Sequence, residues 1–134
     1  MKIVFIFMFL INLFLSANTL DRANSYSEAL KLAKEDNRAI LVLISTKNCP
    51  WCKRLKKNVL SDSEVVSIIN KNFIFIEIDK HSFDYPDYLY ARFVPTLYLI
   101  DPNSEESVIE MYGYKSKKEF MKEINSSESQ KYIK

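Results

Sequence analysis

The segment Cys49-Pro50-Trp51-Cys52 holds both cysteines of the chain and is the segment best suited to chemistry. Residues three apart on a helical turn lie about 5–6 Å apart, a separation that a disulfide accepts. We expect Cys49 at the start of a helix, where unpaired backbone N–H groups and the helix dipole favour a thiolate. Cys52, one turn later on the apolar face, should be more buried and stay a thiol. The spacing therefore predicts an attacking and a resolving cysteine.

Three other roles compete with redox exchange at this pair. A structural disulfide across so short a loop yields only about 2 kcal/mol in the chain-entropy model, against about 3 kcal/mol for a fifteen-residue loop. A zinc site needs four ligands, and two cysteines with the single histidine, His81, supply them only if two chains combine. Unreactive buried cysteines are the third alternative. Redox exchange is favoured because the pair lies where a strand gives way to a helix.

Four apolar or alternating segments predict the strands that position the cysteine pair. Three are apolar throughout or nearly so, as in strands covered on both faces: Ala39–Ile44, Phe73–Ile78 and Thr96–Ile100. The segment Ser107–Met111 alternates and suits a hairpin partner at the sheet edge. The helix that carries the cysteines is expected from about Cys49 to Leu60.

Three Ser-x-x-Glu capping boxes predict further helix starts, at Ser25, Ser61 and Ser116. The segment Asp84-Tyr85-Pro86 can begin a short helix, because proline is tolerated at the first helical position. Helices and strands then alternate, with a terminal hairpin. The pattern predicts an α/β domain whose mixed central β-sheet is flanked by helices on both faces.

Length and composition restrict the function classes. A chain of 134 residues is sufficient for one domain with a core. Lys and Arg number 19 against 17 Asp and Glu, a net charge of +2 that gives no reason to expect a nucleic-acid partner. The single glycine excludes a Gly-rich phosphate loop. No cofactor or metal is expected.

Residues 1–17 have the order of a secretory signal peptide: a basic start, an apolar run and small residues. The run Ile3–Leu15 has thirteen residues, fewer than the roughly 18 needed to span a membrane. An uncleaved N-terminal anchor facing the same compartment is the alternative. We therefore expect a periplasmic or secreted protein, in a compartment where disulfides persist. Residues 18–125 then form the domain and residues 126–134 a polar C-terminal tail.

At this point the chain resembles the thioredoxin superfamily, over roughly residues 25–124. The resemblance is carried by the cysteine motif after a buried strand, by Ile78-Asp79 at the end of the middle strand, by Val94-Pro95-Thr96 before the next strand and by Gly113. Among members of the superfamily the chain looks most like small exported thioredoxin-like proteins of the SoxW kind. The resemblance implies a thioredoxin-like fold and thiol–disulfide exchange.

The resemblance also implies roles for residues outside the cysteine motif. Pro95 corresponds to the family's cis-proline, which packs beside the active cysteines. Val94 would offer its backbone N–H and C=O to an extended substrate strand. Independently of the resemblance, Trp51, inside the cysteine motif, is expected to be exposed beside Cys49 and to contact substrate, with a plain surface aromatic as a close alternative. Gly113 would occupy a packing position or one with positive φ.

Two positions depart from the family pattern. Asn48 stands where thioredoxins carry a tryptophan, and Leu43 stands where they carry a buried acid. In the family that acid helps to deprotonate the resolving thiol. Here water or another group would have to accept the proton of Cys52. Glu77 and Asp79 end the middle strand, and we expect surface roles for both.

Together these observations predict an exported, monomeric thiol–disulfide oxidoreductase acting on protein thiols and disulfides. Reduction of substrates is favoured over oxidation by analogy with exported relatives, which receive electrons from a membrane-embedded thiol carrier. The alternatives are a dithiol oxidant and a binding module on the same fold in which the disulfide is structural.

Overall fold

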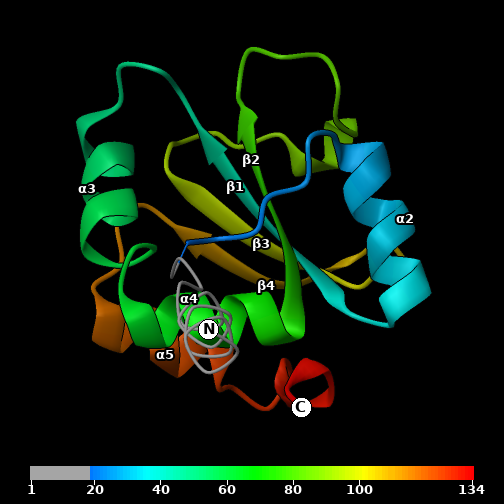
Figure 1. Cartoon of the computed structure of the whole chain (residues 1–134). Coiled ribbons are helices and arrows are strands. Elements are labelled where there is room, and N and C mark those ends of the chain that lie inside the picture. The colour runs from blue at the N-terminus through cyan, green and yellow to red at the C-terminus, as the bar shows by residue number, and fades with distance from the viewer. Residues whose placement is uncertain (1–18) are drawn as a thin grey trace, which may run out of the picture.

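The computed structural model describes residues 19–134, so the predicted signal peptide lies outside the described residues. No helix within residues 19–134 is long and apolar enough to cross a membrane. The elements run in the order α2 (Tyr26–Asp36), β1 (Ala39–Ser45), α3 (Pro50–Asn58), α4 (Ser63–Asn72), β2 (Phe73–Asp79), η2 (Asp87–Leu89), β3 (Thr96–Ile100), β4 (Ser107–Tyr112), α5 (Lys117–Ile124) and η3 (Gln130–Tyr132) (Figure 1).

The four strands form one mixed sheet in the order β2-β1-β3-β4, which confirms the predicted architecture. The strands β1 and β2 are parallel, while β1–β3 and β3–β4 are antiparallel. Strand β1 is central and buried along its whole length. The cysteine motif follows the C-terminal end of β1. Because β1 is an inner strand, the motif lies near the middle of the sheet at that end.

Helices cover both faces of the sheet, as Figure 1 shows, with α2 on one side and α3, α4 and α5 on the other. The alternation of side chains along β1 explains why every residue of this strand is apolar or small. Leu41 and Leu43 pack with the three-helix layer, whereas Ile40 and Val42 pack with α2. Each side of the sheet therefore has its own hydrophobic core.

Two of the predicted helix caps are confirmed and one is wrong. The side chains of Ser25 and Ser116 accept hydrogen bonds from the backbone N–H groups three residues later. Helix α4 is capped by Asp62 and not by Ser61, because the Asp62 carboxylate accepts the N–H groups of the first helical turn. An ionised acceptor at this position also interacts favourably with the positive end of the helix dipole.

The segment near Pro86 and the C-terminus differ from expectation. Pro86 is the N-cap residue of the short 3-10 turn η2, one position before its first helical residue, Asp87. Residues 126–134 do not form the expected polar tail, because Ser129 and Tyr132 are buried and Tyr132 packs on the three-helix core. The backbone N–H of Lys134 donates to Asn72 Oδ1 at 2.7 Å. The apolar ring of Tyr132 thus holds the end of the chain on the domain.

Candidate active site

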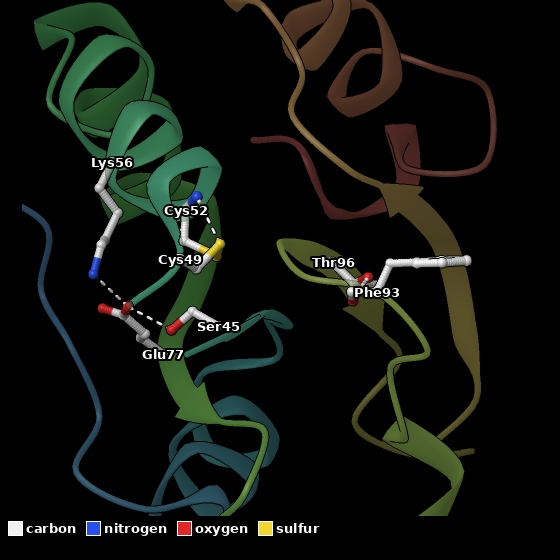
Figure 2. Close-up of a disulfide and its surroundings, with 7 residues drawn as sticks. All are labelled: Ser45, Cys49, Cys52, Lys56, Glu77, Phe93 and Thr96. Atoms are coloured by element: carbon white, nitrogen blue, oxygen red, sulfur yellow. Dashed lines mark hydrogen bonds and ion pairs between the residues drawn. A yellow bond between two sulfur atoms is a disulfide. The ribbon is translucent and has the colours of Figure 1, made fainter. Parts of the chain in front are cut away.

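The two cysteines lie at the start of α3 and are joined in a disulfide with a Cα–Cα distance of 5.2 Å. Cys49 is the N-cap residue of α3, and the backbone N–H of Cys52 donates to Cys49 Sγ at 3.0 Å (Figure 2). Cys49 is 7% exposed and Cys52 is 1% exposed. The predicted asymmetry, with Cys49 at the helix start and Cys52 one turn deeper, is confirmed.

The position of Cys49 has a direct chemical consequence for the reduced protein. A thiolate at Cys49 Sγ receives a backbone N–H hydrogen bond and lies at the positive end of the helix dipole. Helix α3 has no acidic residue in its first turn, so no negative charge there opposes a thiolate. Cys49 can therefore act as nucleophile and as leaving group, while Cys52 is shielded from solvent.

A second segment, Val94–Thr96, contributes to the same end of the sheet. The Val94–Pro95 peptide bond is cis, as the resemblance implied. Thr96 Oγ1 donates to the carbonyl of Phe93 at 2.8 Å, across the turn drawn at the right of Figure 2. Gly113 N–H donates to the carbonyl of Pro95 at 2.8 Å, and Gly113 has a φ of 74°, which favours glycine. These bonds fix the turn that carries Pro95.

A cavity of about 360 Å³ joins the cysteine helix to this turn and is lined by Trp51, Val94, Pro95, Gly113 and Tyr114. The structure thus brings together Trp51, Val94 and Pro95, the three residues expected, besides the cysteines, to contact substrate. Tyr114 is a lining residue that the sequence did not indicate, because it is far from the motif in the chain. We call this cavity the peptide groove.

One wall of the peptide groove is built from two aromatic rings, and a guanidinium contacts both of them. The rings of Trp51 and Tyr114 have centroids 5.8 Å apart, and Trp51 is 53% exposed, as predicted. The Arg54 guanidinium lies 5.2 Å from each of the two ring centroids. Such contacts are favourable through the ring quadrupole. The indole is therefore held against its neighbours in the groove wall.

The backbone of Val94 is available for hydrogen bonding. Within residues 19–134, its N–H and C=O make no hydrogen bond, although strand β3 begins two residues later, at Thr96. An unpaired N–H and C=O beside a groove can add an extended peptide by strand pairing. The geometry agrees with the backbone role that the resemblance implied for Val94.

Glu77 has a buried environment, so the prediction of a surface role for it is wrong. It lies opposite Leu43 in the parallel β1–β2 register, and its side chain is 17% exposed. Its Oε1 accepts hydrogen bonds from Ser45 Oγ at 2.8 Å and Lys56 Nζ at 2.6 Å (Figure 2). Its Oε2 accepts from Arg22 at 2.5 Å. The family's buried acid would stand at Leu43 in β1, whereas here Glu77 in β2, opposite Leu43, supplies a carboxylate.

The charge of Glu77 is fixed by these partners. Burial alone would raise the pKa of Glu77, but hydrogen bonds from Lys56, Ser45 and Arg22 outweigh it and lower the pKa. Glu77 is thus ionised at neutral pH and ties β2 to β1, to α3 and to the chain before α2. Asp79 and His81 are exposed, in agreement with the expected surface role of Asp79.

The chain is similar to known proteins over most of its length. A family model described as a thioredoxin-like domain matches residues 26–127, most of the chain. The chain belongs to the thioredoxin-like family. The match includes the cysteine motif, the cis-proline turn and all four strands of this thioredoxin-like protein.

Three relatives illustrate the similarity. A thioredoxin from Thermus thermophilus shares 27% identity with a TM-score of 0.66, covering 79% of this chain and 85% of that one. A DsbH oxidoreductase shares the fold at 21% identity with a TM-score of 0.60, covering 72% of this chain and 77% of that one. An uncharacterized protein from Archaeoglobus fulgidus is 32% identical over 69 residues, 52% of this chain. The chain spans 54% of the length of that relative.

Proposed function

We propose that this thioredoxin-like protein is an exported thiol–disulfide oxidoreductase that reduces disulfides in protein substrates. The observation that carries the proposal is the N-cap position of Cys49, whose Sγ accepts the Cys52 N–H while Cys52 itself is buried. A purely structural disulfide has no need of this asymmetry. The family membership and the cis-proline turn beside the pair support the same assignment.

The reaction begins with the dithiol form of the protein. The Cys49 thiolate attacks one sulfur of the substrate disulfide, so that the substrate S–S bond breaks and its other sulfur leaves as a thiolate that takes a proton from water. Cys52 then loses its proton to solvent and attacks Cys49 Sγ. The mixed disulfide breaks, and the second substrate sulfur leaves as a thiolate that takes a proton from solvent. Two electrons pass from the cysteine pair to the substrate, and the protein ends as the disulfide seen here.

The peptide groove supports a protein as substrate. An extended segment around the substrate cysteine would pair with the free N–H and C=O of Val94. The segment would lie against Pro95, Trp51 and Tyr114, which line the groove. Backbone pairing depends little on side-chain identity, so several protein substrates can be accommodated.

Export and the direction of electron flow are further parts of the proposal. The predicted signal peptide at residues 1–17 supports a periplasmic or secreted location, with an N-terminally anchored form as the alternative. A membrane-embedded thiol carrier would return electrons to the pair. A reductant should show a reduction potential near the roughly −270 mV of thioredoxin, whereas a value near the −120 mV of a strong oxidant would reverse the assigned direction.

The assignment of the two cysteines is tested by trapping. With a protein disulfide such as insulin, Cys52→Ser should accumulate a mixed disulfide through Cys49, and Cys49→Ser should accumulate none. A non-reducing gel followed by mass spectrometry of the linked peptide measures both results. Equal trapping by the two variants, or full reductase activity when both cysteines are replaced, would refute the proposed reaction.

A further inference from the structure

Charge is distributed unevenly between the cysteine segment and the rest of the chain. Residues 45–60 contain five Lys and Arg and no Asp or Glu, which leaves 14 basic and 17 acidic residues for the remainder. The whole chain has a net charge of only +2. The cysteine segment therefore carries a charge of +5, while the remainder of the chain carries −3. Such a separation steers an oppositely charged partner toward one face.

A second cavity, of about 380 Å³, flanks the cysteines on the side of β2. Four cations and two carboxylates line it. Glu77 is already matched by Lys56 and Arg22. The exposed side chains of Lys47 and Lys53 have no ion pair within residues 19–134. The second carboxylate, Asp79, is exposed and has no ion pair in the described part of the chain, so the four cations and two carboxylates leave this cavity a net charge of +2 for a binding partner.

A further cation, Arg54, contacts the aromatic wall of the peptide groove. The guanidinium of Arg54 lies 5.2 Å from the ring centroids of both Trp51 and Tyr114, which are themselves 5.8 Å apart. Contacts with ring faces leave the N–H groups at its edge available to a carboxylate. No acidic residue lines the groove, and Arg54 forms no ion pair in the part of the chain that the structure describes.

We infer that the preferred substrates are protein disulfides whose cysteines are flanked by Asp or Glu. The inference rests on the proposed function and adds a substrate class to it. A segment paired with Val94 would lie against the aromatic wall that Arg54 contacts, and Lys47 and Lys53 line the second cavity. Acidic residues on either side of the substrate cysteine would meet these cations. Charge complementarity of this kind raises the association rate and selects partners.

The experiment uses two cyclic peptides that are identical except for the residues flanking each cysteine, Glu in one and Gln in the other. The pre-reduced protein is mixed with each peptide, and the fluorescence of Trp51, the single tryptophan, reports oxidation of the pair. At low salt we expect reduction of the Glu peptide to be faster by on the order of tenfold. In about 1 M NaCl, where the Debye length is about 3 Å, the two rates should converge.

Variants locate the effect. Lys47→Gln/Lys53→Gln and, separately, Arg54→Gln should each reduce the Glu-to-Gln rate ratio several-fold. The matched control is Lys31→Gln/Lys71→Gln, which removes the same charge from exposed sites on α2 and near the C-terminal end of α4. It should keep the wild-type ratio. Every rate is divided by the rate with hydroxyethyl disulfide, an uncharged small substrate, to correct for altered thiol reactivity.

The outcomes separate the two levels of the proposal. If the wild type reduces neither the peptides nor hydroxyethyl disulfide, the proposed function itself fails. If it reduces both peptides at equal rates at every salt concentration, the oxidoreductase function stands and the acidic-substrate inference is overturned. An equal loss of the rate ratio in the control variant also overturns the inference, because only total charge would then matter.

Discussion

Replacement of Glu77 by glutamine should destabilise the protein in a pH-dependent manner. The carboxylate accepts one hydrogen bond from the buried Ser45 and two from cations whose side chains are 35% exposed at Lys56 and 47% exposed at Arg22. Weakening the buried bond costs about 1–2 kcal/mol. Loss of two partly exposed ion pairs adds at most about 1 kcal/mol each. We expect Glu77→Gln to lower the free energy of unfolding by about 2–3 kcal/mol at pH 7.

The sign of the pH dependence follows from the lowered pKa of Glu77 in the folded state. A group with a depressed folded pKa contributes stability above its unfolded pKa, about 4.3 for Glu, and loses that contribution as pH falls through the folded pKa. The difference in free energy of unfolding between wild type and Glu77→Gln should therefore be largest at pH 7 and decrease below about pH 4.

The assay is guanidinium chloride unfolding of both oxidised proteins between pH 2 and pH 7. Glu64→Gln is the matched control, since Glu64 is 61% exposed in its ion pair with Lys117 and should change stability less. A Glu77→Gln protein as stable as wild type at pH 7 would contradict the assigned network. A gap that stays constant down to pH 2 would contradict the ionised state of Glu77.

Three further predictions concern the scaffold. Phe120→Ala, at a fully buried site of α5, should cost about 3–5 kcal/mol and lower the melting temperature by roughly 10 °C or more. Gly113→Ala should cost about 1–2 kcal/mol through its positive φ alone, because an added Cβ meets nothing within 4 Å. The hydrogen bond from Tyr132 to Asp101 outweighs burial and lowers the pKa of Asp101 to about 2, so Asp101→Asn should reduce stability at pH 7. That difference should vanish as pH falls from about 4 toward 2, which acid unfolding curves of both proteins would show.

The sequence was sufficient to predict features that depend on local pattern. The apolar runs at Ala39–Ile44 and Phe73–Ile78 correspond to buried strands, and the cysteines lie one turn apart at a helix start. These features follow from periodicity and from contacts between residues close in the chain. The mixed sheet then follows from the alternation of helices and strands.

Features that depend on long-range placement were not predictable in this way. The burial of Glu77 arises from the register between β1 and β2 and from Arg22, which lies 55 positions away in the chain. Tyr114 joins Trp51 in the groove only because β4 returns the chain to the cysteine helix. The polar neighbours of Tyr132 predict a polar tail, whereas its single ring is enough to bind the segment to the core.

The central claim is that the start of α3 makes Cys49 a reactive thiolate, while Cys52 stays a shielded thiol until it resolves the mixed disulfide. The most direct measurement is the rate at which iodoacetamide, an uncharged reagent, alkylates each cysteine of the reduced full-length protein at pH 6 to 7, followed by peptide mass spectrometry. Cys49 should react faster than free cysteine and at least about tenfold faster than Cys52. Equal rates at the two positions, or a first modification at Cys52, would contradict the claim.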